Sequence, residues 1–148
     1  MWFLVFALVS SSPDFNTRLI IKLSEILKTA PPTKIQVEIL TQKEMQKEFQ
    51  DYQMASCMRS VKSFRYCADS TRNSNAFILG LWVGESDPKF LHIKVYEKAG
   101  VEATVHEYVH WWLYHATEPK GVINTEEMTR LFTDLVLSSQ VFIDWLER

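Results

Sequence analysis

Two histidines and a glutamate share one short run, His106-Glu107-Tyr108-Val109-His110. On a helix, side chains four residues apart lie on one face, one turn apart, so both imidazoles could bind a single small cation. Glu107 would point toward the same side, close enough to accept a proton from a water molecule bound to that cation. The run therefore predicts a metal site with a general base beside it.

Zinc (Zn2+) is the ion that we expect, because it accepts histidine and carboxylate ligands in a tetrahedron and has no redox side reactions. The alternative is an amphipathic helix whose histidines only pack in the core or face solvent. Glu107 argues against that alternative, since its neighbours Val105, Tyr108 and Val109 are uncharged and a carboxylate among them is costly to bury without a charge partner. A bound cation would supply the partner.

Two histidines leave a catalytic zinc ion short of a third protein ligand. We expect Glu127 to be that ligand, with Glu126 as the alternative. The apolar residues of the helix that follows define its buried side: Met128, Leu131, Phe132, Leu135 and Phe142. At about 100° per residue, Glu127 aligns with Leu131 and Leu135, whereas Glu126 falls opposite them.

Each glutamate also has a purely structural interpretation. Glu127 would form a capping box with Asn124, and Glu126 would complement the helix dipole in the first turn. His115 is a weaker candidate ligand. It lies nine residues after His106, roughly opposite it on a continuous helix, and reaches the same ion only if the helix breaks.

The first half of the chain predicts a helix, a strand and a second helix. The first helix begins at Ser12-Pro13-Asp14 and ends near Thr29. Alternating polar and apolar residues over 34–40 predict a half-buried strand, and the run 41–44 is a capping box for the next helix. The polar stretch 55–75 is expected to be a loop with one short strand around 63–67.

The second half predicts two strands and two helices. Strands over 77–83 and 90–96 are separated by a short turn and should form an antiparallel hairpin. A helix over 101–115 carries the His-Glu-His run, and a last helix, capped by Asn124 or Thr125, reaches Leu146. This order predicts an α+β fold in which a small antiparallel or mixed sheet packs on helices.

Length and composition favour a single domain over residues 1–148. The chain is 47% hydrophobic and 23% charged with a formal net charge of −2, values that are typical of a soluble globular protein. Near-neutral charge without a cluster of Lys and Arg argues against a nucleic-acid partner. No apolar stretch has the length of a transmembrane helix. Oligomeric state is left open.

The N-terminal segment and the cysteines bear on the compartment. Residues 1–12 are either signal-like or a buried N-terminal segment, because an apolar run precedes small residues but no Lys or Arg stands ahead of it. Cys57 and Cys67 could form a disulfide in an oxidising compartment or remain thiols in a cytosol. The cytoplasm is favoured, with secretion as the alternative if residues 1–12 act as a signal.

The helix with His106-Glu107-x-x-His110, preceded by the strand 91–96 and followed by Glu127, resembles the zincin metallopeptidases, in particular their glutamate-liganded (gluzincin-like) branch. The uncharged flanks Ala103-Thr104-Val105 and Trp111-Trp112 agree. The resemblance covers residues 90–137, roughly a third of the chain. The chain departs from the thermolysin-like pattern at one position. Thermolysin-like members place an aspartate four residues after the ligand glutamate, where this chain has Arg130 or Leu131; Asp134 is one turn further along.

The resemblance implies a zincin-like domain that hydrolyses peptide bonds. Zinc would activate a water molecule, and Glu107 would accept its proton and pass it to the leaving amine. The strand 91–96 would be the sheet edge beside the cleft, where an extended polypeptide substrate could pair. Tyr114, His115 and His92 are the candidates for stabilising the developing oxyanion.

A non-catalytic module is the alternative function: a zincin-like fold that keeps zinc in order to fold or to bind a partner. A purely structural zinc site has four protein ligands and does not need Glu107. The chain offers three good ligands together with Glu107, a combination that favours an open, hydrolytic site.

Overall fold

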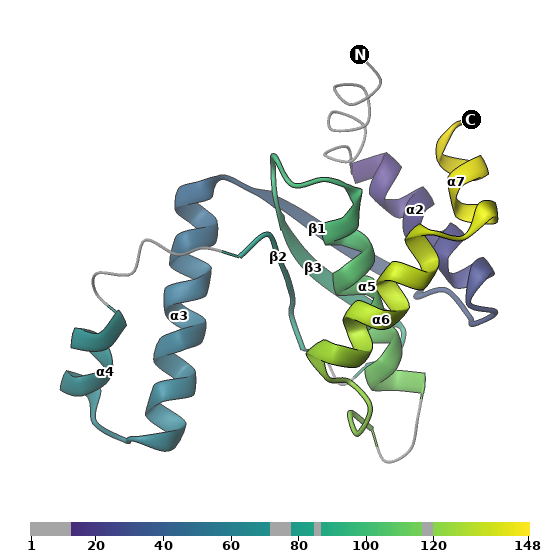
Figure 1. Ribbon diagram of the computed structural model, residues 1–148. Helices are drawn as coiled ribbons and strands as arrows, with labels where there is room; N and C mark the ends of the chain where they lie inside the picture. Colours follow the sequence, from purple (N-terminus) through teal and green to yellow (C-terminus); the bar gives the residue numbers. More distant parts are fainter. Residues whose placement is uncertain (1–12, 72–77, 85–86, 117–119) are drawn as a thin grey trace.

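The computed structural model describes residues 13–71, 78–84, 87–116 and 120–148 (Figure 1). These residues form six helices and one three-stranded mixed sheet, which confirms the predicted α+β class. The segment 1–12, for which the sequence left two interpretations, and Phe77 of the predicted strand lie outside the described residues. Within the described part of the chain, no helix is both long and apolar enough to span a membrane.

The sheet consists of β1 (Lys34–Leu40), β2 (Gly80–Trp82) and β3 (Phe90–Tyr96) in the order β1-β3-β2. β3 pairs in parallel with β1 and in antiparallel fashion with β2, so the predicted hairpin is confirmed. The expectation that the strand 91–96 forms the sheet edge is wrong. β1 pairs with the whole length of β3 on one side and β2 pairs on the other, so β3 is the central strand. The edge beside the motif helix is β2.

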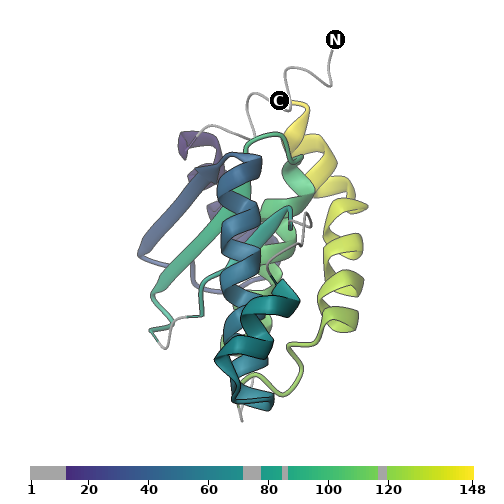
Figure 2. The same cartoon turned by 90° about the vertical axis from the view of Figure 1, so that its left-hand side faces the viewer.

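Helices cover both faces of the sheet (Figures 1 and 2). On one face, Leu91, Ile93 and Val95 of β3 are buried in the core with residues of α2 (Pro13–Ile26) and α5 (Val101–Ala116). The alternate β3 residues face α3 (Gln42–Ser60) on the other side, where Lys94 Nζ lies 2.7 Å from Glu48 Oε1.

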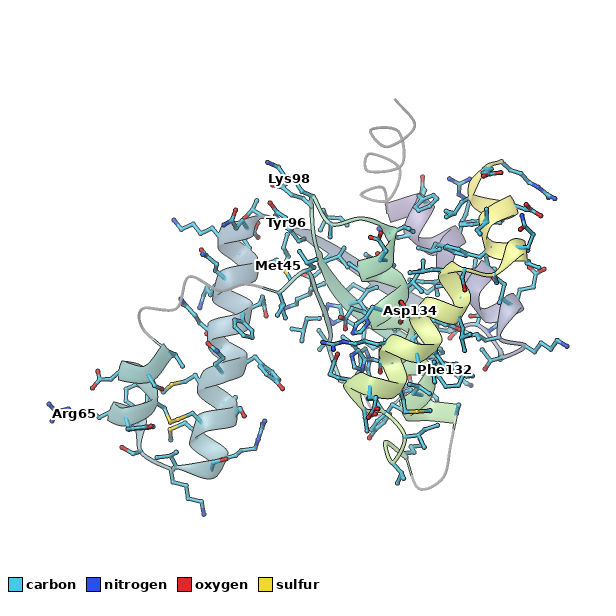
Figure 3. All side chains as sticks on the ribbon, in the orientation of Figure 1. Met45, Arg65, Tyr96, Lys98, Phe132 and Asp134 are labelled. Atoms are coloured by element: carbon cyan, nitrogen blue, oxygen red, sulfur yellow. A yellow bond between two sulfur atoms is a disulfide. The ribbon has the colours of Figure 1, made fainter. Side chains whose placement is uncertain are left out.

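Of the stretch 55–75, predicted as a loop with a short strand, residues 55–71 differ from the prediction, and residues 72–75 lie outside the described residues. α3 extends to Ser60 from the predicted Thr41–Glu44 capping box, and a further helix, α4, spans Phe64–Thr71. Of the α4 residues, only Cys67 is buried, so the segment lacks the apolar stripe by which a helix is recognised in a sequence. A disulfide between Cys57 and Cys67 joins the two helices on the side away from the sheet (Figure 3).

The predicted last helix is divided into α6 (Glu126–Leu137) and α7 (Gln140–Leu146). Thr125 caps α6 by accepting a hydrogen bond from the Met128 N–H, and Ser139 caps α7. The buried residues of α6 are Thr129, Thr133 and Val136. The predicted buried side is therefore wrong in part, because Leu131 and Leu135 are 51% and 56% exposed.

Candidate metal centre

The two histidines of α5 lie on one side of the helix, as their spacing predicts. Their rings approach edge to face with centroids 4.8 Å apart. One potential ligand atom from each of His106, Glu107 and His110 lies within 4.8 Å of the others. Both histidines are half-buried, whereas Glu107 is buried. The three side chains could hold a metal ion.

Glu126 completes the group. Its Oε1 lies 2.8 Å from His110 Nε2, and its Oε2 lies 3.3 Å from His106 Nε2. One carboxylate thus contacts the same nitrogen of both imidazoles. Two nitrogen donors and one carboxylate therefore meet at one place, at the junction of α5 and the first residue of α6.

The structure places Glu126, and not Glu127, beside the histidines. Glu126 stands two turns before the buried Thr133, so it lies on the face of α6 that packs on α5. Glu127 shares its face with the exposed Leu131, and it lines neither of the two cavities that Glu107 and Glu126 line. The preference for Glu127 followed from taking Leu131 and Leu135 as core residues; both are exposed, and the carboxylate that contacts the histidines is that of Glu126.

The second ring nitrogen of His110 is held from the segment that leads into α6. His110 Nδ1 lies 2.8 Å from Asn124 Oδ1 and 3.2 Å from Thr129 Oγ1. The Thr129 hydroxyl donates its own proton to the Thr125 carbonyl, so both neighbours of Nδ1 act as acceptors. These acceptors favour a proton on His110 Nδ1, which is the tautomer whose Nε2 can bind a metal ion.

Glu107 is enclosed by the edge strand. Its side chain is 7% exposed, and burial raises its pKa from 4.5 to about 8, although a hydrogen bond from the Trp82 backbone opposes the shift. A Cβ atom at Gly80 would lie 2.9 Å from Glu107 Cγ, closer than real side chains tolerate. Glycine at position 80 thus permits β2 to pack directly on the carboxylate, a role that the sequence analysis missed.

The electrostatic environment favours a neutral His106. Burial lowers the pKa of this histidine, and the neighbouring His110 lowers it further, while Glu126 acts in the opposite direction. A neutral imidazole is the form that binds a metal ion.

Two cavities meet at the group, and both are lined by Gly80, Glu107 and Glu126. The smaller has a volume of about 260 Å³ and extends past His110 toward α3. The larger has a volume of about 590 Å³ and extends past His106 along α6. Glu107 and Glu126 therefore line both cavities, whereas His110 lines the smaller and His106 the larger.

The predicted oxyanion donors lie elsewhere. Neither Tyr114 nor His115 lines a cavity that reaches Glu107. Tyr114 packs on Trp82 with ring centroids 5.2 Å apart, and His115 lines a separate cavity with the tandem Trp111-Trp112. His92 contacts Glu38 of β1. Among the described residues that line the two cavities, Tyr52 and Arg130 carry donor groups that the sequence analysis did not consider.

The structure thus brings His106, Glu107, His110 and Glu126 together; Glu126 and Glu127 are both exposed, but Glu126 is the one that contacts the histidines. Asp134, considered above for the missing aspartate, lines the larger cavity beside Arg130. Comparison of the chain with models of protein families, with curated proteins and with solved structures gave no match.

Proposed function

We propose that this protein is a zinc-dependent metallopeptidase in which His106, His110 and Glu126 hold the metal and Glu107 is the general base. One observation carries the proposal: a single Glu126 carboxylate contacts Nε2 of both histidines while the buried Glu107 lies beside them at two open cavities. The resemblance of the α5 motif to the zincins supports the same function.

The donor set fits zinc. Two imidazole nitrogens and one carboxylate are the protein ligands of a known class of catalytic zinc sites, which keep a further position open for water or substrate. The acceptors at His110 Nδ1 favour the tautomer in which Nε2 is available as a ligand atom. A cation would also stabilise the ionised form of Glu107, which burial disfavours. Bound zinc would supply activation of water and polarisation of the substrate carbonyl.

Glu107 is placed to move protons. The Trp82 N–H holds its carboxylate on one side, and the carboxylate faces both cavities. In the proposed reaction Glu107 accepts the proton of the attacking water and later gives it to the departing amine nitrogen. Because the carboxylate is fixed by β2, it does not have to be reoriented between the two transfers.

The free edge of β2 supports a polypeptide substrate. Leu79 O accepts from Tyr96 N, and Val83 N donates to His92 O, so these residues direct their backbone groups toward β3. By the alternation of an antiparallel ladder, Gly80 and Trp82 direct theirs away from β3, and since the Trp82 N–H bonds to Glu107, the Gly80 groups and the Trp82 carbonyl remain for a peptide. An extended peptide could pair with this edge and pass Glu107. β2 therefore takes the part that the sequence analysis gave to the strand 91–96.

The test is casein cleavage by the wild type, by Glu107→Gln and by Glu127→Gln, which alters an exposed glutamate of the same region. We expect all three to contain zinc, and we expect Glu107→Gln to cleave about 10²–10⁴-fold more slowly, the usual contribution of a general base. Cleavage by Glu107→Gln at the wild-type rate would refute the mechanism. A full zinc content without cleavage by any of the three would favour the non-catalytic zinc module.

A further inference from the structure

We infer that α3 supplies the specificity subsite of this enzyme, and that this subsite takes an aromatic or large aliphatic side chain adjacent to the scissile bond. The inference rests on the peptidase function proposed above. It assigns a role to Phe49 and Tyr52, which belong to the part of the chain outside the zincin resemblance.

The smaller cavity is apolar along the wall formed by α3 and β2. Phe49 and Tyr52 line it from α3, and Ile78, Leu81 and Trp82 line it from the segment around β2. Its other wall is the candidate metal centre. A volume of about 260 Å³ lies below the range of about 300–1,000 Å³ typical of pockets for drug-sized ligands. The cavity therefore suits one large side chain of a bound peptide.

The position of α3 explains why aromatic rings meet the metal centre. Met45 is fully buried and lies between α3 and the sheet (Figure 3), and Glu48 pairs with Lys94 of β3. Phe49 and Tyr52 follow Met45 by one and two turns, so they lie on the same helix face. Tyr52 nevertheless remains 53% exposed. The helix thus presents an aromatic side chain to the cavity without covering it.

The strand alternation directs one substrate side chain toward this wall. Gly80 faces Glu107, and the Trp82 ring packs on Tyr114, so both positions face α5. Leu81 faces the opposite side, toward α3. A peptide paired with the edge of β2 presents alternate side chains to the same two sides. In such a peptide, one residue lies at Glu107, and the residue next to it presents its side chain to Phe49 and Tyr52.

The larger cavity is lined by charged side chains, whereas the smaller cavity has an apolar wall. We therefore expect the smaller cavity to prefer an apolar substrate side chain over a charged one. Glu102, Arg130 and Asp134 line it with the buried Thr133, whose hydroxyl has no hydrogen-bond partner among the described residues. A charged substrate side chain can find partners there. The α3 wall offers apolar surface instead, and burying an apolar side chain on it gains about 25 cal/mol per Å².

A panel of peptides that differ at one position, occupied by Phe, Leu, Ala, Lys or Glu, tests the inference. For wild type we expect the highest kcat/KM with Phe or Leu. Tyr52→Ala should reduce the ratio of kcat/KM for Phe over Lys by at least about 10-fold, the scale of discrimination in apolar pockets. Tyr52→Phe should retain the ratio, because the ring remains. Lys47→Ala, an exposed change on the same helix, should leave the ratio unaltered.

Two results would overturn the inference: an unchanged ratio in both Tyr52→Ala and Phe49→Ala, or an equal loss of the ratio in Tyr52→Phe and Tyr52→Ala. A binding measurement separates its failure from failure of the proposed function. When the peptides are titrated into the Glu107→Gln variant and followed by tryptophan fluorescence, the Phe peptide should bind more tightly than the Lys peptide. Adding Tyr52→Ala to this variant should abolish that difference in affinity. If the wild type cleaves none of the peptides, the peptidase proposal fails. If the Phe and Lys peptides bind with equal affinity, the subsite is contradicted, whatever the result of the cleavage assay.

Discussion

His110 Nδ1 lies 2.8 Å from Asn124 Oδ1, so the residue before the Thr125 helix cap fixes the second histidine of the cluster. The next residue after the cap is Glu126, whose carboxylate contacts Nε2 of the same ring. Three consecutive residues at the start of α6 therefore contact one ring nitrogen of His110 and place a carboxylate at the other. Such supporting contacts fix the tautomer and the ring orientation of a metal-binding histidine.

Asn124→Ala should weaken zinc binding by about 10–100-fold, because loss of a supporting hydrogen bond to a ligand histidine typically has this cost. Asn124→Asp keeps an acceptor oxygen at the same place and should bind zinc at least as tightly as the wild type. Competition with a chromophoric chelator measures both affinities. An unchanged affinity in Asn124→Ala would show that the contact does not orient a ligand.

Glu107 should make the stability of the metal-free protein depend on pH. Its pKa is raised from 4.5 to about 8, so the folded protein retains a proton that the unfolded chain loses in that window. The stability associated with this proton is fully present below pH 4.5 and is lost as the pH rises toward about 8.

Glu107→Gln removes this titration. In the presence of a chelator, the variant should be more stable than the wild type at pH 8, by a few kcal/mol in order of magnitude, and the difference should shrink toward pH 4.5. Urea unfolding across this pH range gives the free energies. Parallel pH profiles for the two proteins would mean that Glu107 is not desolvated in the fold.

Gly80→Ala should impair catalysis and spare metal binding. The new Cβ would lie 2.9 Å from Glu107 Cγ, so either the carboxylate or β2 must move. A displacement of about 1 Å in a catalytic group can cost on the order of 100-fold in rate. Gly84→Ala is the matched control, since its Cβ would meet no atom of the described residues within 4 Å. Zinc content and kcat/KM are measured for both, and wild-type kcat/KM in Gly80→Ala would argue against the close packing.

Replacement of both cysteines by serine should loosen α4 and leave the metal centre intact. Cys67 is the one buried residue of α4, and its disulfide to Cys57 ties that helix to α3. Hydrogen exchange should show loss of protection at the amides of Phe64–Thr71, while those of α5 keep theirs. Unchanged protection of Phe64–Thr71 would indicate that packing on α3 suffices to hold α4.

The local features of the site could be predicted from the sequence, because they depend on spacing along a single helix. His106, Glu107 and His110 come together at the junction with α6 as their positions require. The third carboxylate depends on which face of α6 packs on α5. That face is marked by the buried Thr129 and Thr133, not by leucines, and the Thr129 hydroxyl bonds to the Thr125 carbonyl and lies beside His110 Nδ1. An apolar pattern could not reveal it.

The order of the strands in the sheet also could not be predicted from local sequence patterns. Strand 90–96 was recognised and paired correctly with the segment before it, but its second partner, β1, comes from 56 residues earlier in the chain. That long-range pairing makes β3 central and β2 the edge. Packing of β2 on Glu107 also requires glycine at position 80. In a sequence, glycine inside a strand indicates only a less stable strand, so this contact could not be predicted from it.

The central claim is tested most directly by the zinc content of three proteins dialysed against the same low concentration of free zinc: the wild type, Glu126→Gln and Glu127→Gln. The two variants remove the same charge from adjacent positions, so a difference between them reports the ligand and not the overall charge. We predict about one zinc ion per chain in the wild type and in Glu127→Gln, and a large deficit in Glu126→Gln. A full zinc content in Glu126→Gln, or a deficit confined to Glu127→Gln, would contradict the site described by the structure.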